Sequence, residues 1–228
     1  MVKVYNDVIG KTNLNYAYNT LKQNILRLDL KPGEEIKDSE LQIILRMSRT
    51  PIREAILLLK HEGLVETIAQ SGTFVSKIDK KKYRDGRMMR ICLETKILNL
   101  ACQDFPQEYL KKLEEILEKQ KYVMDMTRDH VEFHRLDIEF HKTIFAGLGY
   151  ENLFQVAYNG LSDYMRIREL NAVSKINDSF ILDGHYKIYN IIKDKKCDEI
   201  DEVLDEHFSK LDPKVEYFIE EYPCYFKE

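Results

Sequence analysis

Apolar residues recur at helical spacing in the first part of the chain and define two helical segments there. The first segment carries Tyr18, Leu21, Ile25 and Leu28 along one face. Pro32-Gly33 then marks a turn. The second segment is short; Asp38 is its expected N-cap, and its apolar positions are Leu41, Ile44 and Leu45.

A third helical segment and a hairpin follow. Ser48 is the expected N-cap of the third segment, Pro51 is tolerated in its first turn, and Gly63 ends it as a left-handed cap. Its buried arc is Ile52, Ala55, Ile56 and Leu59. After Gly63 the period changes, and 64–68 and 73–76 are expected to be strands joined around Gly72. This order of elements is typical of a winged helix-turn-helix over residues 1–78, with a small β-hairpin wing.

From residue 79 to 228 the pattern is almost wholly helical, so the fold class expected for the chain is mainly α. About six segments are expected, at 81–104, 107–127, 129–147, 151–171, 178–195 and 197–220. The breaks fall at Phe105-Pro106, at 147–150 and at 174–177, and Lys80-Lys81-Lys82 is interpreted as a polar hinge. Helices of this length with short connections predict an antiparallel all-α bundle as a second domain.

Composition sets broad limits on this picture. With 44% hydrophobic residues the chain can build a packed core. No apolar run approaches the roughly 20 residues that cross a bilayer, and the first residues lack the apolar stretch of a signal peptide. We therefore expect a cytoplasmic protein without a membrane partner. Four cysteines lie far apart without a C-x-x-C pair, so we expect reduced thiols rather than a zinc finger or a disulfide framework.

The charge balance gives little support for a nucleic-acid partner. Residues 1–78 carry 11 basic and 9 acidic residues, whereas the remainder carries 24 and 30. The case for DNA therefore rests on the third helical segment, where Arg49 and Arg53 share a face. Arginine can donate two hydrogen bonds to guanine, and Ser48 and Thr50 hydroxyls can hold phosphate. Taken alone, two such arginines are better explained by a solvated helix face.

Three bundle segments each direct a histidine toward apolar positions. Asp137 and His141 are spaced i, i+4 among phenylalanines, and His185 and His207 each lie in a stripe of aliphatic residues on a later segment. Buried polar groups need partners, since each one left unpaired costs roughly 1–3 kcal/mol. A divalent metal and a hydrogen-bonded core cluster satisfy this need equally well on pattern alone. His130 and His134 lie on nearly the same helical face and are interpreted as exposed or as neighbours of the ligands.

The segment Ser48-Arg49-Thr50-Pro51-Ile52-Arg53-Glu54-Ala55, with Leu30-Lys31-Pro32-Gly33 upstream, resembles the signature of the GntR family of bacterial regulators. The resemblance covers residues 16–78 and implies that Ser48, Arg49, Thr50, Arg53 and the wing glycine Gly72 contact DNA. Two positions depart from it. Arg46 stands where the family usually has glycine in the turn, and Ser39 replaces a usual basic residue.

The bundle resembles the FCD domain of the FadR-like branch of that family. The resemblance rests on Asp137-x-x-x-His141, His185 and His207, and on Arg90-Ile91-Cys92-Leu93-Glu94. It implies a zinc or nickel ion held by the aspartate and three histidines, with open positions for a carboxylate effector. Arg90 is either an internal ion-pair partner of Glu94 or a clamp for that carboxylate, and Arg168, like Arg166, is a weaker second candidate.

These observations predict a regulator rather than an enzyme. We expect a homodimeric repressor that binds an inverted repeat in double-stranded DNA, with an operator affinity set by a small organic acid beside the metal. The alternative is the same DNA-binding head with a structural or metal-sensing site and no organic effector. A metallohydrolase is disfavoured, because no general base is evident beside the four ligand positions.

Overall fold

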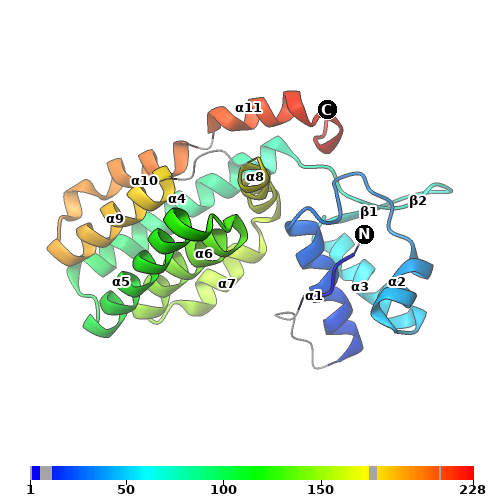
Figure 1. Ribbon diagram of the computed structural model, residues 1–228, viewed down its shortest axis with the longest axis horizontal. Coiled ribbons are helices and arrows are strands. Elements are labelled where there is room, and N and C mark those ends of the chain that lie inside the picture. Colours follow the sequence, from blue (N-terminus) through cyan, green and yellow to red (C-terminus); the bar gives the residue numbers. More distant parts are fainter. Residues whose placement is uncertain (1, 6–11, 175–178, 211) are drawn as a thin grey trace. The chain divides into compact units, whose positions relative to one another are not determined.

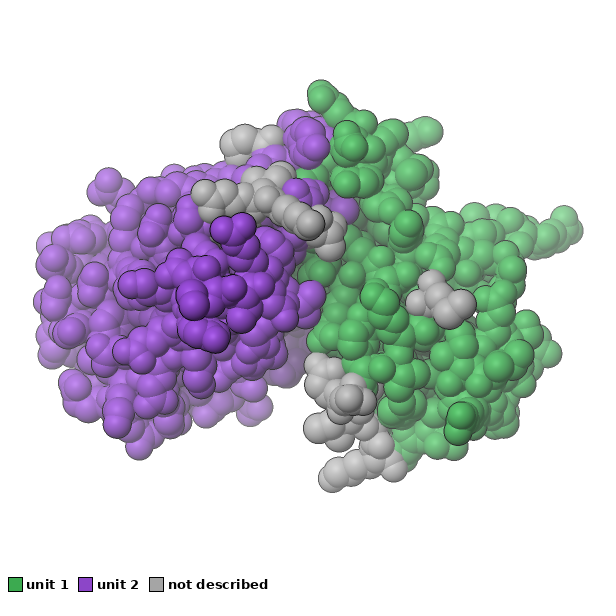
Figure 2. Space-filling view, in the orientation of Figure 1, with its two compact units in different colours: residues 1–83, 162–169, 218–228 green, residues 84–161, 170–217 purple. Residues whose placement is uncertain are grey.

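The computed structural model describes residues 2–5, 12–174, 179–210 and 212–228, and the chain divides into two compact units. Unit 1 contains residues 1–83, 162–169 and 218–228, and unit 2 contains 84–161 and 170–217 (Figure 2). Each unit has its own apolar core. The chain is mainly helical, as predicted, and the described residues form one two-stranded antiparallel sheet.

Unit 1 contains the predicted winged helix-turn-helix (Figure 1). Its elements are α1 (Asn13–Leu26), α2 (Asp38–Leu45), α3 (Arg49–His61), β1 (Val65–Ile68) and β2 (Gly72–Val75). Helix α3 packs against both α1 and α2. Its core-facing residues Ile52, Ala55 and Leu59 are fully buried, because apolar residues at this spacing lie on one side of the helix.

The ends of α2 and α3 follow local signals. Ser48 is the N-cap of α3, and Gly63 adopts a φ of 73° just beyond its end, as predicted. The prediction for Asp38 is wrong by one residue, because Lys37 is the N-cap and Asp38 lies in the first turn of α2. Leu28 lies outside α1 with a φ of 57°, so the first helix ends earlier than its apolar pattern.

The helices of the bundle run from the end of the wing to near the C-terminus. They are α4 (Lys80–Gln103), α5 (Gln107–Tyr122), the π-helical turn η1 (Val123–Thr127), α6 (His130–Gly147), α7 (Glu151–Asn159), α8 (Ser162–Val173), α9 (Ser179–Asp194), η2 (Cys197–Glu199), α10 (Ile200–Ser209), α11 (Asp212–Glu221) and η3 (Pro223–Tyr225). In unit 2, α5 packs against α6 and α9, and α9 packs against α10. These contacts bring α6, α9 and α10, the three histidine-bearing helices, around one core.

Two predicted helices are each divided in the structure. The segment expected at 151–171 forms α7 and α8, because the chain turns at Gly160 and inserts Leu161, 1% exposed, into the core. The segment expected at 197–220 forms η2, α10 and α11, and Pro213 near the start of α11 has no backbone N–H to continue the preceding helix. The break expected at 174–177 falls largely outside the described residues, as does the expected helix start at 178. Leu211, one of the aliphatic residues expected in the same stripe as His207, also lies outside them.

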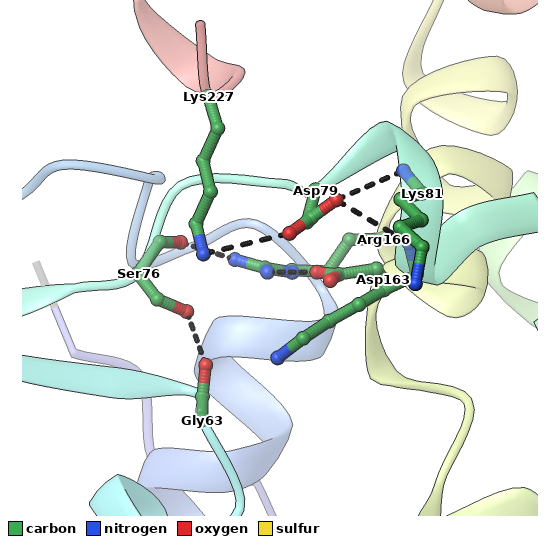
Figure 3. A network of polar contacts seen from close by, with 8 residues as sticks. Gly63, Ser76, Asp79, Lys81, Asp163, Arg166 and Lys227 are labelled. Atoms are coloured by element: carbon green, nitrogen blue, oxygen red, sulfur yellow. Dashed lines mark hydrogen bonds and ion pairs between the residues drawn. The ribbon is translucent and has the colours of Figure 1, made fainter. Parts of the chain in front are cut away.

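The predicted polar hinge at Lys80-Lys81-Lys82 is wrong, because these residues form the first turn of α4. Asp79 Oδ1 accepts hydrogen bonds from the backbone N–H groups of Lys81 and Lys82 at 2.8 and 3.3 Å (Figure 3). A carboxylate at this position accepts hydrogen bonds from backbone N–H groups that have no partner within the helix, because they lie in its first turn. The opposite carboxylate oxygen lies 3.7 Å from Lys227 Nζ.

Part of α8, Ser162–Glu169, packs in unit 1 and contributes a buried arginine there. Arg166 is 1% exposed and pairs with Asp163, and its Nη1 donates to the carbonyl oxygen of Ser76 at 2.5 Å. The Ser76 hydroxyl donates in turn to the carbonyl oxygen of Gly63 at 2.6 Å (Figure 3). The chain leaving the wing is thereby tied both to α8 and to the end of α3.

The expectation of reduced thiols is wrong for two of the four cysteines. Cys102 at the end of α4 and Cys197 in η2 form a disulfide, with Cα atoms 5.8 Å apart. They are separated by 95 positions in sequence, so spacing along the chain gave no indication of their proximity. Cys92 and Cys224 are free and exposed.

None of the helices among the described residues is both long and apolar enough to span a membrane.

Candidate functional site

The start of α3 presents the predicted DNA-contacting residues on one exposed surface. Ser48, Arg49, Thr50 and Arg53 are all exposed, and the two arginine side chains expose 58% and 60% of their surface. Asp38 Oδ2 accepts hydrogen bonds from Nε of both, at 3.1 and 3.0 Å. Burial would raise the pKa of Asp38, but Arg53 and Arg49 outweigh it and lower the pKa. The ionised carboxylate holds the two guanidinium groups side by side.

Two backbone positions shape the rest of this surface. Gly72 begins β2 opposite Ile68 with a φ of 145°, a conformation that side-chain-bearing residues rarely adopt. Arg46, between α2 and α3, adopts a left-handed conformation with a φ of 52°. This is the position where the sequence departs from the GntR pattern of glycine, and an L-residue there costs on the order of 1 kcal/mol.

In unit 2, three imidazole rings meet at the centre of the bundle. His141 comes from α6, His185 from α9 and His207 from α10, and their ring centroids are 5.1 to 5.5 Å apart. One nitrogen of each ring lies within 4.8 Å of a nitrogen of the other two. Asp137 Oδ1, one helical turn before His141, lies 3.4 Å from His185 Nε2. The structure therefore brings together the four residues that the sequence singled out.

The cluster is buried, and its side chains carry the donor atoms and charge that favour a cation. His141 and His185 are fully buried, and Asp137 and His207 expose 1% and 8%. Burial, followed by the neighbouring His185 and His141, holds the pKa of His207 well below its usual value, so its ring is neutral. Among the described residues, neither His141 Nε2 nor His207 Nδ1 has a hydrogen-bond partner. Neutral imidazoles with unused nitrogens are the donors that zinc and similar ions prefer.

Arg90 and Glu94 lie next to the cluster on α4. Nε and Nη2 of Arg90 lie 2.8 and 2.7 Å from Glu94 Oε1, and Glu94 Oε2 lies 2.6 Å from His141 Nδ1. The Arg90 guanidinium also lies over the Phe208 ring, 4.5 Å from its centroid. Burial raises the pKa of Glu94, but Arg90 and His141 outweigh it and lower the pKa to about 2. Glu94 is therefore a carboxylate in contact with both groups.

Two further residues shape the cluster, and sequence reasoning missed both. Gln120, fully buried on α5, places Oε1 2.9 Å from His185 Nδ1. Gly184 on α9 leaves room for His207, because a Cβ atom at this glycine would lie 2.3 Å from His207 Nδ1. A glycine in the middle of a helix weakens that helix, so such a glycine usually has a packing or functional reason. The position of Gly184 next to His185 was therefore the sequence signal that could have identified it.

The remaining candidates are not members of the three-histidine group. His134 is 8% exposed and packs edge-on against Phe133, so the interpretation of an exposed side chain is wrong for it. His130 is half-buried at the start of α6. Arg168 is 5% exposed and packs in unit 1, with its guanidinium 6.0 Å from the centroid of Tyr164. Its predicted role toward an effector stays a prediction.

Two family models match the chain. The model described as bacterial regulatory proteins, gntR family, matches residues 15–75, and the model of the FCD domain matches residues 86–210. The chain belongs to the GntR family. It combines that family's DNA-binding head with an FCD domain, so it is a DNA-binding transcriptional regulator and not an enzyme.

Individual GntR-family relatives agree with this assignment. An uncharacterized HTH-type transcriptional regulator from an unstable DNA locus of Streptomyces ambofaciens is 28% identical over 80% of this chain and 76% of its own length. The HTH-type transcriptional repressor RspR of Escherichia coli is 22% identical over 92% of both chains. The solved structure of McbR/YncC from E. coli has the same fold, with a TM-score of 0.75, 19% identity and coverage of 93% and 100% of the two chains.

Proposed function

We propose that this regulator is a repressor whose operator affinity responds to a small organic acid bound beside a divalent metal in the FCD domain. The convergence of three buried imidazoles and Asp137 carries the proposal. Three nitrogen donors and one carboxylate suit zinc or nickel better than magnesium or calcium, which prefer oxygen ligands. When bound, such an ion supplies a Lewis acid that attracts a carboxylate.

Arg90 is the group that we assign to the effector's carboxylate, with Arg168 as a second candidate. A guanidinium can bind a carboxylate through two parallel hydrogen bonds. In this structure Arg90 approaches a single oxygen of Glu94, through an Nε hydrogen bond and an Nη2 ion-pair contact. The same contacts favour a second candidate function, in which Arg90 serves Glu94 alone and the site senses only the metal. Titrating organic acids into the metal-loaded protein and measuring operator affinity separates the two functions, since only the first predicts a change.

DNA reading is assigned to Ser48, Arg49, Thr50 and Arg53 on α3 and to Gly72 in the wing. A single helix-turn-helix contacts few base pairs, so we propose a homodimer on an inverted repeat of the operator. We assign repression rather than activation because two relatives are named as repressors. They are RspR of E. coli and the gluconate operon transcriptional repressor of Bacillus subtilis. A protein that acts on bacterial DNA works in the cytoplasm.

Replacing Arg53 or Arg49 by alanine is expected to weaken operator binding by roughly 1–3 kcal/mol each, if the guanidinium contacts guanine. Both side chains are exposed and held by Asp38, so their loss removes no core packing. Fluorescence anisotropy on operator and on random DNA measures the effect. We expect a larger loss on the operator than on random DNA.

Asp38→Asn is a companion variant that tests the part played by the carboxylate between the two arginines. It removes the carboxylate that contacts both arginines while leaving the arginines in place. Because it also removes a negative charge near DNA phosphates, operator affinity should stay the same or rise. Equal losses on operator and random DNA for the arginine variants would show that they contact phosphate only.

A further inference from the structure

Two residues that are not among the four proposed metal ligands each contact the Nδ1 atom of a ligand histidine. Glu94 Oε2 lies 2.6 Å from Nδ1 of His141, and Gln120 Oε1 lies 2.9 Å from Nδ1 of His185. Both come from helices other than those of the histidines, and both are buried, Glu94 at 4% and Gln120 at 0% exposure. The first contact is an ion-pair distance and the second is a hydrogen bond, but both bring an oxygen to the same ring atom, and this indicates a common role.

We propose that Glu94 and Gln120 are positioning residues for the metal, which fix His141 and His185 so that both present Nε2 to the ion. This inference rests on the proposed metal site and specifies how that site is held. A neutral imidazole carries its proton on one nitrogen and a lone pair on the other. An oxygen acceptor at Nδ1 keeps the proton there, so the lone pair lies on Nε2.

The other contacts in the cluster agree with this arrangement. His185 Nε2 is the atom that faces Asp137 Oδ1, at 3.4 Å, and His141 Nε2 is buried without a hydrogen-bond partner among the described residues. The Nε2 atom of His185 therefore faces Asp137 of the cluster, and the Nδ1 atom of each of the two rings faces its supporting residue.

The two supporting residues differ in charge, and this difference predicts unequal contributions. Glu94 is held in place by two nitrogens of Arg90 and brings a negative charge to His141. A carboxylate makes an imidazole a stronger donor to a cation than a neutral amide does. Gln120 brings only an oriented oxygen to His185. Glu94 therefore strengthens binding through charge and orientation, and Gln120 through orientation alone.

Metal affinity and the spectrum of bound cobalt test the proposal on the full-length protein. Co²⁺ and Zn²⁺ affinities are measured by competition with a chromophoric chelator for wild type, Glu94→Gln and Gln120→Leu, with the exposed Glu108→Gln as control. Each of the first two variants should bind metal about 10- to 100-fold more weakly, and the control should match wild type. The visible absorption bands of bound Co²⁺ should keep their position and intensity, because the ligands themselves do not change.

The outcomes are distinct. Wild-type affinity in both variants would overturn the positioning role while leaving the metal site intact. A changed cobalt spectrum in Glu94→Gln would show that Glu94 is itself a ligand and would also overturn it. Gln120→Leu keeps the test valid if Glu94→Gln does not fold, since it leaves no charged group unpaired. A wild-type protein that binds neither ion would instead overturn the proposed function.

Discussion

Replacing Gly184 by alanine is expected to abolish high-affinity metal binding, although this residue cannot coordinate an ion. Its Cβ atom would lie 2.3 Å from Nδ1 of His207 and 3.1 Å from Cγ of the same ring, so the imidazole must leave its place. Losing one nitrogen from a four-ligand site weakens metal affinity severely, and binding free energy is coupled to folding. Isothermal titration with zinc and thermal melting with and without zinc measure both effects.

We expect Gly184→Ala to be unfavourable, whereas the usual effect of this substitution in a helix is to stabilise it. Alanine in place of a helical glycine normally stabilises a helix by about 0.5–1 kcal/mol. Gly160→Ala is the matched control, because the atoms nearest to its added Cβ lie 3.5 and 3.7 Å away, in ordinary contact. The control should bind zinc like wild type. Wild-type zinc affinity in Gly184→Ala would show that His207 is not a ligand.

Replacing Arg166 by methionine is expected to destabilise the protein by about 3–5 kcal/mol, because it leaves the buried Asp163 carboxylate without its partner. Arg166 is 1% exposed and Asp163 is 7% exposed, so solvent screens neither group. Burial lowers the pKa of Arg166 and Asp163 opposes that shift, as expected for a charge that depends on its partner. Urea unfolding followed by circular dichroism measures the free energy of unfolding.

The double variant Asp163→Leu/Arg166→Met is the informative comparison. Replacing a whole buried ion pair by apolar side chains is often neutral, so the double variant should recover most of the loss. The hydrogen bond from Arg166 to Ser76 would still be missing, and Ser76 bonds in turn to Gly63 at the end of α3. Recovered stability with weakened operator binding would indicate that this network positions α3. A cost below about 1 kcal/mol for the single variant, the range of exposed pairs, would contradict the account.

The winged helix was predictable because its signals are local. Ser48, Pro51 and Gly63 define the limits of α3 within a short stretch of sequence, and the strands follow at once. The inward direction of His141, His185 and His207 was predictable for the same reason, since helical spacing alone assigns each to an apolar face. Both predictions needed nothing beyond neighbours on the same helix.

What escaped prediction depends on pairs that are distant in sequence. Glu94 meets His141 and Gln120 meets His185 only because α4, α5, α6 and α9 pack together. The disulfide of Cys102 with Cys197 has the same origin, as does the space that Gly184 leaves for His207. Helical periodicity shows that a residue faces inward, but it does not show which side chain it meets there.

The metal content of the purified protein tests directly whether Asp137, His141, His185 and His207 bind an ion. Wild type, prepared without chelators, should contain about one zinc or nickel ion per chain by mass spectrometry, and His185→Ala and His207→Ala should contain none. Basal DNA binding of both variants should persist, because the residues that we propose contact DNA lie in unit 1. A wild-type protein without bound metal, whose melting temperature does not change on adding zinc, nickel or manganese, would contradict the account and leave the histidines as a hydrogen-bonded core cluster.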